Sequence, residues 1–188
     1  MGITLGLSRA PSRVAALLVT AFTALAAHAA SADVFIEVGA QAARVEATIA
    51  LQDDKITEDE SGWHLGIGAS RAFGMRNEIG VRIELDSIGS DLLLAVRALD
   101  YRRHINERIA LGAFVGAARL DLATPAYGYY LGGGVHFKDV VASWDLGIDL
   151  RFGDKVARDN LLPTDPRGGS PDNFYDITGI SLYLRHTF

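Results

Sequence analysis

Charged residues at alternate positions are the part of this sequence best suited to do chemistry. Carboxylates and guanidinium groups that are enclosed together can pair and hydrogen-bond, which avoids the cost of a buried unpaired ion. We therefore predict a structural salt-bridge network on one face of the alternating segments, with a gated polar path as the alternative. Its members are five acids and four bases: Glu37, Arg82, Glu84, Asp86, Arg97, Asp145, Asp149, Arg151 and Arg185.

Metal and phosphate chemistry find little support in the residue spacing. The five histidines are isolated along the chain, and none falls at ligand spacing with another His or with an acid cluster. The acidic stretch 53–60 could gather oxygen ligands around Ca²⁺, but it lacks the Gly-containing register of an EF-hand and is interpreted as a solvated loop. Gly132-Gly133-Gly134 falls inside a predicted strand, where glycine relieves crowding. We expect no catalytic residue, no metal ligand and no cofactor.

The spacing of the charges is that of β-strands, in which successive side chains point to opposite faces. Apolar and polar residues alternate most clearly in 142–152, in the final segment 180–188, and from Ile79 to Asp86. In a segment around 92–103, Arg97 and Asp100 fall on opposite faces, so either a bulge shifts the register or Asp100 lies near an aqueous rim. Less regular segments complete the set at 34–46, 63–73, 92–103, 109–121 and 127–137.

The connections fall into two kinds, as consecutive antiparallel strands require. Short turns are predicted on one side at 74–78, 104–108 and 138–139. The other side carries the connections 52–61, 87–91, 123–126 and 153–176. A soluble β-sandwich would also alternate, but Gly and Ala among the charges leave room for long side chains inside a narrow barrel. We predict an all-β fold, an eight-stranded antiparallel up-and-down transmembrane β-barrel.

The beginning of the chain has the features of a secretory signal peptide. Arg9 and Arg13 precede the uncharged, largely apolar run 14–27, and small residues follow. Cleavage at Ala30-Ser31-Ala32 is favoured over Ala27-His28-Ala29, and an uncleaved anchor is the alternative, although the run is shorter than the roughly 20 residues of a spanning helix. The predicted domains are a cleaved signal peptide, 1–32, and a barrel domain, 33–188.

Charge and cysteine content limit the partners. Cleavage after residue 32 would remove Arg9 and Arg13 and no acid, leaving 16 Lys and Arg against 23 Asp and Glu, so the net charge moves from −5 to −7. Nucleic acid is not expected as a partner, because neutralising phosphates needs a basic face. The chain has no cysteine, which excludes disulfides and a lipid-modified N-terminal Cys.

The last strand carries a resemblance to a known family. In 180–188, alternating apolar residues lead to a terminal Phe188, which resembles the C-terminal signature of bacterial outer-membrane barrels, although His186 replaces the usual aromatic or apolar residue. With its length and eight predicted strands, the chain resembles the small OmpA/OmpX-like barrels of Gram-negative bacteria. The resemblance implies an outer-membrane location, contact with outer-membrane lipid and lipopolysaccharide, and Phe188 as a signal for the barrel-assembly machinery. We expect a monomer.

Enzymes occur among small outer-membrane barrels, notably lipid A acyltransferases and deacylases. The deacylase type pairs a His with a Ser two residues later, a spacing absent at His64, His104 and His136. His186 has only Thr187 beside it, and adjacent strand residues point to opposite faces. We predict a non-enzymatic barrel that supports envelope integrity or binds an extracellular ligand at loops 52–61 and 153–176. A narrow porin-like channel and a lipid A-modifying enzyme are the alternatives.

Aromatic residues near one predicted rim suit the interfacial girdle of a membrane barrel, where amphipathic rings prefer to lie. These residues are Trp63, Tyr127, Tyr129, Tyr130, Phe174 and Tyr175.

Overall fold

The computed structural model describes residues 32–49, 54–121, 126–158 and 173–188. Residues 1–31 of the predicted signal peptide therefore lie outside the described residues, and the signal peptide stays a prediction. Among the described residues, no helix has the length and apolar character needed to cross a membrane.

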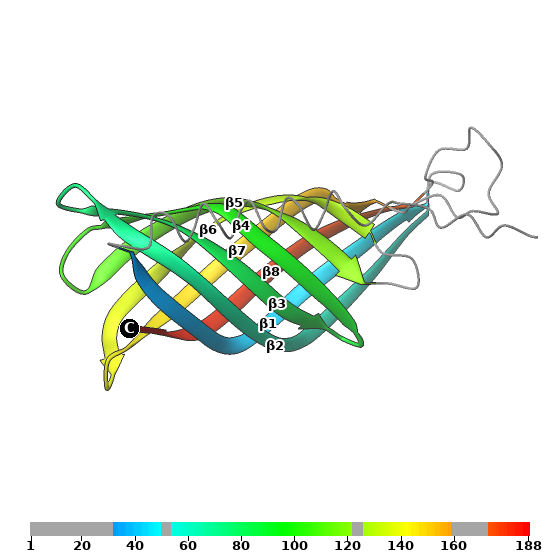
Figure 1. Ribbon diagram of the computed structural model, residues 1–188. Helices are drawn as coiled ribbons and strands as arrows, with labels where there is room; N and C mark the ends of the chain where they lie inside the picture. The colour runs from blue at the N-terminus through cyan, green and yellow to red at the C-terminus, as the bar shows by residue number, and fades with distance from the viewer. Residues whose placement is uncertain (1–31, 50–53, 122–125, 159–172) are drawn as a thin grey trace, which may run out of the picture. The chain divides into compact units, whose positions relative to one another are not determined.

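Eight antiparallel strands, each hydrogen-bonded to the next, form one closed barrel (Figure 1). The last strand pairs with the first, from Ile49 opposite Asn173 to Phe35 opposite Thr187. This closure confirms the predicted up-and-down barrel and excludes a β-sandwich. The strands are β1 (Asp33–Ile49), β2 (Asp54–Phe73), β3 (Asn77–Ile88), β4 (Asp91–His104), β5 (Ile109–Asp121), β6 (Ala126–Val141), β7 (Trp144–Arg158) and β8 (Asn173–Thr187).

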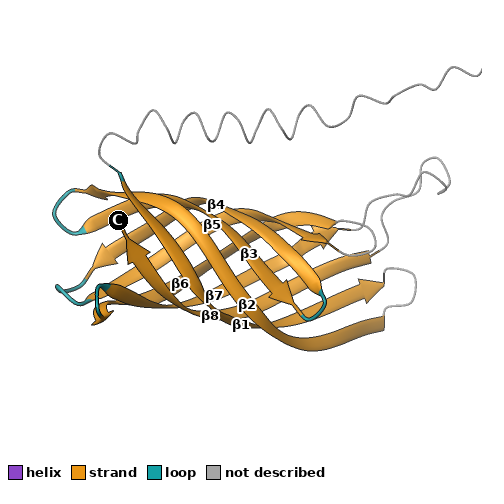
Figure 2. Cartoon of the chain, turned by 60° about the horizontal axis from the view of Figure 1, so that its bottom comes forward, coloured by secondary structure: helices purple, strands orange, loops and turns teal. Residues whose placement is uncertain are grey.

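The two ends of the barrel differ. Figure 2 shows the C-terminus at the same end as the turns that follow β2, β4 and β6. At this end, which we call the terminal end, the Phe188 amide donates a hydrogen bond to the Val34 carbonyl at 2.9 Å. The opposite end, the distal end, carries the Gly89–Ser90 turn. The connections 50–53, 122–125 and 159–172 lie outside the described residues.

The prediction of a loop at 52–61 is wrong for residues 54–61, which belong to β2. β2 begins at Asp54, which pairs with Ile49 of β1, so the acidic stretch is a strand extension. Strand alternation persists there because Ile56 faces the interior while Asp59 points outward and binds Arg44. The density of acids concealed that alternation in the sequence. The connection predicted at 153–176 is also shorter, because β7 continues to Arg158 and β8 starts at Asn173.

The turn predicted at 138–139 lies four residues later. β6 continues to Val141, and the turn consists of Ala142 and Ser143, whose φ angles of 42° and 69° are in the left-handed region. Ala142 was predicted as the first residue of the following strand, which in fact begins at Trp144. A register shift after Phe137 allows the longer pairing, since an irregularity in one strand absorbs the extra residues.

The outer surface is apolar around the barrel wall. On β1 the outward-facing side chains are apolar from Val34 to Ala42, a run of about the 9 to 11 residues that a membrane-spanning strand needs. Arg44 then begins a charged stretch beyond this band. Other exposed apolar side chains include Leu65, Ile67, Leu94, Leu111, Val115, Leu150 and Leu182.

The interior is divided into two zones. Toward the distal end lies an apolar layer, and Val45 and Tyr175 pack against it. Charged and hydrogen-bonding residues fill the barrel below that layer. The apolar layer consists of Ala43, Ile88, Leu93, Ala95, Phe114, Ala118, Leu120, Tyr130 and Ile177.

The predicted aromatic girdle is partly wrong. Trp63, Tyr127 and Tyr129 are exposed on the outside, as expected. Tyr130, by contrast, is 2 % exposed inside the barrel, because it has the opposite parity from its neighbour Tyr129. Tyr175 also faces inward and lines an interior cavity at the distal end. The side chain of Phe174 lies outside the described part of the structure.

Candidate functional site: an interior ion cluster

Eight of the nine charged residues predicted to face the interior are buried there, and the exception is Asp145. Asp145 lies beside the β6–β7 turn, where its carboxylate accepts a hydrogen bond from the Asp139 amide at 3.0 Å. That contact keeps Asp145 with the turn. The buried eight are Glu37, Arg82, Glu84, Asp86, Arg97, Asp149, Arg151 and Arg185.

The centre of the charged zone is Arg82 on β3, whose side chain is fully buried. Its Nη1 donates to Glu37 at 2.5 Å, and its Nη2 donates to Asp100 at 2.6 Å. Glu84 and Asp149 each place a carboxylate oxygen 3.6 Å from the same guanidinium. Four acids from four strands therefore surround one cation, which suits the planar, many-donor guanidinium better than an ammonium.

Two further arginines extend the pairing around the barrel. Arg151 binds Asp86 at 2.7 Å and Glu84 at 2.9 Å. Arg97 lies 2.7 Å from both Glu84 and Asp149, at angles outside hydrogen-bond geometry, so these contacts are ion pairs. The Arg97 guanidinium also lies over the Phe114 ring, 3.4 Å from its centroid, which adds a cation–π contact.

Nine residues are connected by such pairs, and we call them the interior ion cluster. Each contacts an oppositely charged member at 3.6 Å or less. The cluster consists of Glu37, Arg82, Glu84, Asp86, Arg97, Asp100, Arg102, Asp149 and Arg151.

The sequence prediction omitted Asp100 and Arg102 from the cluster. A register shift between Arg97 and Leu99 reverses the parity of β4, so that Arg97, Asp100 and Arg102 all face inward. Of the two alternatives for Asp100, the bulge is therefore correct. The conflicting parity of Arg97 and Asp100 was the available signal, and extending the shifted register by two residues would have added Arg102.

Uncharged and aromatic partners were also missed. The Tyr183 hydroxyl donates to Asp149 at 3.0 Å and accepts a hydrogen bond from Arg82 at 3.3 Å. His64 Nδ1 lies 2.5 Å from Asp86, and the Tyr130 hydroxyl donates to Glu84 at 3.1 Å. The alternation of their strands places His64, Tyr130 and Tyr183 inside the barrel. It does not show which residues of distant strands they contact.

Glycines in neighbouring strands make room for these large side chains. A Cβ on Gly147 would lie 2.3 Å from the ring of Tyr183, and one on Gly132 would lie 2.2 Å from the ring of Phe114. Both glycines are inside strands, as predicted for Gly132. A side chain at either position would push an aromatic ring away from the arginine it contacts.

Arg185 forms a smaller group nearer the terminal end. Its Nη2 donates to Ser70 at 2.9 Å and to Glu78 at 3.2 Å, and its guanidinium lies 3.5 Å from the centroid of the Phe35 ring. Arg185 has these partners instead of the acids around Arg82.

One group of residues has the donor types of a metal site. Ligand atoms of Glu37, His64 and Glu84 lie within 4.8 Å of one another. This grouping was missed because the three residues come from different strands. The Arg82 guanidinium is already 2.5 Å from Glu37 and 3.6 Å from Glu84. A divalent ion would be repelled by that fixed positive charge, so the donor set fits the arginine better than a metal.

Small bacterial barrels of known structure are similar to this chain. Neisserial surface protein A is 16 % identical over 84 % of this chain and 99 % of its own, with a TM-score of 0.48. Ail of Yersinia pestis, solved in a phospholipid bilayer nanodisc, is 11 % identical over 84 % of this chain and 100 % of its own, with a TM-score of 0.47. Ail in complex with the heparin analogue sucrose octasulfate is 14 % identical over 82 % of this chain and 99 % of its own, with a TM-score of 0.43.

These similarities do not assign the chain to a family. No protein-family model and no curated protein matches it. At these identities and TM-scores the likeness concerns the fold alone, which the pairing of all eight strands establishes independently.

Proposed function

We propose that this protein is a non-enzymatic outer-membrane barrel with a closed interior and a structural or surface-interaction role. The observation that carries the proposal is the cluster around Arg82, where oppositely charged side chains pair while buried inside the barrel. An eight-stranded barrel encloses only enough space for side chains, so a filled interior leaves little room for a stable ion path.

The apolar outer band supports the membrane location. Exposed apolar side chains outside and buried charges inside are the reverse of a soluble protein and the pattern of a transmembrane barrel. With both termini in the periplasm, the distal end faces the outside of the cell. Loops on a rigid scaffold commonly carry binding, so a partner is expected at that end.

The burial of two histidines argues against a lipid-modifying enzyme that would use either of them as its base. His64 and His136 are 0 % and 4 % exposed inside the barrel, and the apolar outer wall separates them from lipid. A lipid hydrolase needs its base within hydrogen-bond reach of the proton that it removes from the nucleophile or water.

Planar-bilayer recording of the mature barrel tests the closed interior. We expect no stable conductance, because the interior cations are held by ion pairs and the apolar layer covers them. A steady, ion-selective current would overturn this part of the proposal. Heat-dependent gel migration should be recorded in parallel, so that a silent bilayer containing unfolded protein is not counted as support.

Lipid A analysis tests the non-enzymatic assignment separately. Mass spectra of lipid A from cells with and without the gene should show the same acyl chains. A gained or lost acyl group that depends on the gene would contradict the assignment, whatever the bilayer recordings show.

A further inference from the structure

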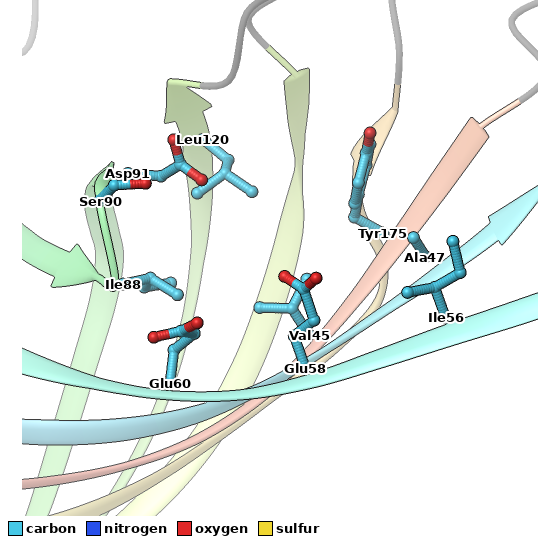
Figure 3. Close-up of a pocket in the computed structure, with 10 residues that line it drawn as sticks. All are labelled: Val45, Ala47, Ile56, Glu58, Glu60, Ile88, Ser90, Asp91, Leu120 and Tyr175. Atoms are coloured by element: carbon cyan, nitrogen blue, oxygen red, sulfur yellow. The ribbon is translucent and has the colours of Figure 1, made fainter.

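The distal end of the barrel contains a cavity of about 260 Å³ above the apolar layer. Figure 3 shows the side chains that border it, which come from β1, β2, β3, the β3–β4 turn, β4, β5 and β8. The lining residues are Val45, Ala47, Ile56, Glu58, Glu60, Ile88, Ser90, Asp91, Leu120 and Tyr175.

The floor of this cavity is formed by buried apolar side chains. Ile88 and Leu120 are only 5 % and 2 % exposed, and both belong to the apolar layer. Val45 and Tyr175 pack against the same layer from the cavity side. The apolar layer therefore lies between the cavity and Arg82 with its partners. A ligand in the cavity would contact the lining residues and not the interior ion cluster.

The wall of the cavity carries carboxylates that have no cationic partner among the described residues. Among the described residues, the side chains of Glu58, Glu60 and Asp91 form no ion pair and no hydrogen bond. On the outward face of the same hairpin, Asp59 binds Arg44 at 2.7 Å, and Glu46 lies 4.0 Å from Lys55. The outward acids of β1 and β2 thus have cationic partners, whereas the acids that face the cavity lack them.

We propose that this cavity binds a small amphipathic cation, namely a primary ammonium carried on a short apolar body. The apolar part would lie on Ile88 and Leu120, and the ammonium would reach the carboxylates of Glu58 and Glu60. Ligand pockets combine an apolar lining with a few placed polar groups, and this cavity is slightly smaller than their usual volume range, which suits a small ligand. The carboxylates of Glu58, Glu60 and Asp91 also attract cations from solution.

Matched probes test the proposal on the mature chain in zwitterionic phosphatidylcholine nanodiscs. Phenethylammonium, 2-phenylethanol and 3-phenylpropanoate share an aromatic body and differ in charge. Ligand-observed NMR at low salt should show binding in the order ammonium, alcohol, carboxylate, and the ammonium should weaken as salt is added. Equal binding of all three would overturn the proposal, because it would indicate apolar partitioning alone.

Two kinds of variant locate the site. Glu58→Gln with Glu60→Gln should weaken phenethylammonium binding about fivefold, since exposed charge pairs each contribute modestly. Glu107→Gln at the terminal end is the control and should leave binding unchanged. Ala47→Phe keeps the three carboxylates and fills the cavity, so it should abolish binding. Binding that survives both changes would place the cation elsewhere.

A segment of this chain is the alternative occupant of the cavity, in place of a free ligand. If a variant lacking 159–172 binds phenethylammonium and the complete chain does not, the free-ligand proposal is wrong and the cavity belongs to a segment of this chain. This test is independent of conductance, because the apolar layer lies between the cavity and the interior ion cluster. A conducting barrel would contradict the closed interior and leave the cavity result standing.

Discussion

Arg82 shows how a single side chain can organise the interior of this barrel. It is fully buried and contacts Glu37 and Asp100 directly, so its removal would leave two acids without their main partner. Removing one member of a buried ion pair is costly, whereas replacing a whole pair with apolar groups is often tolerated. The cluster is therefore expected to be sensitive to single truncations.

Arg82→Ala should lower the free energy of unfolding by about 3–5 kcal/mol, reduced where water enters the interior. Urea unfolding followed by the fluorescence of Trp63 and Trp144 would measure this change. Arg103→Ala removes an exposed arginine from β4 and should change stability by less than about 0.5 kcal/mol. Arg82→Lys keeps the charge but loses the planar fork, so it should fall between the two. Equal stability of all three variants would contradict the central role of Arg82.

Asp59 lies beyond the apolar band, where pairing acts in water. Arg44 donates to its carboxylate from Nε at 2.7 Å and from Nη2 at 3.1 Å, and this hydrogen bonding lowers the pKa of Asp59 below 3.8. Because the pKa of Asp59 is lowered in the folded state, its pairing with Arg44 contributes to folding stability above the ordinary carboxyl pKa. This contribution is lost as the pH falls through the lowered pKa. NMR titration of Arg44→Gln should show the Asp59 pKa rising, whereas Lys55→Gln should leave it unchanged.

At the scale of elements, the outward residues of β7 show how depth in the membrane sets the cost of a charge. Trp144 follows the turn directly and lies 5.0 Å from the ring of His186, near the terminal-end interface. Ile148 pairs with Leu182 further along the strand, nearer the middle of the apolar band. A change to arginine should therefore have unequal effects at these two sites.

Ile148→Arg should destabilise the inserted barrel by about 2–4 kcal/mol, and Trp144→Arg by about 1 kcal/mol or less. Unfolding from phospholipid vesicles would measure both values. A larger loss at Trp144 than at Ile148 would mean that the assumed membrane position is wrong.

The element scale also explains the errors in strand length. β1 and β2 continue past the apolar band as a hairpin, and their pairing from Ile49 with Asp54 is held by backbone hydrogen bonds that need no apolar outer face. Charged residues on the outside of this extension resemble a loop in the sequence. A strand that has left the membrane keeps its period of two but loses its apolar side.

For the whole molecule, assembly into the membrane is the property that we expect a substitution at the C-terminal residue to affect most. Phe188 is 72 % exposed, and its ring lies 4.8 Å from that of His186 in an edge-to-face arrangement. Its amide donates to Val34, which helps join β8 to β1 at the closing seam. The predicted role of Phe188 as an assembly signal rests on the family resemblance.

Phe188→Asp should reduce the folded, heat-modifiable protein in outer-membrane fractions, because a charged terminus removes the expected assembly signal. Phe188→Tyr is the matched control and should assemble normally. Both variants should also be folded from urea into detergent. A defect of Phe188→Asp in detergent as well would indicate a loss of barrel stability instead of a loss of recognition in the cell.

The sequence by itself determined the barrel and the direction of most of its side chains. Alternation along 79–86 and 180–188 assigned each residue to the inside or the outside, since the strand period is two regardless of the partner strand. The charges on β3 could be identified in the same way, whereas Phe188 was singled out by the family resemblance. The shorter turns were located to within a few residues, apart from the one that moved to Ala142 and Ser143.

Only the tertiary structure decided which interior residues meet. The bulge after Arg97 brought Asp100 and Arg102 to the cluster, and closure of the barrel brought Tyr183 of β8 within 3.3 Å of Arg82 on β3. The positions of the apolar layer, the ion cluster and the cavity also depend on the tertiary structure. They are set by how residues of different strands align along the barrel axis. Alternation records the face of a residue, but contact depends on the relative register of strands, and that is fixed only when all eight close together.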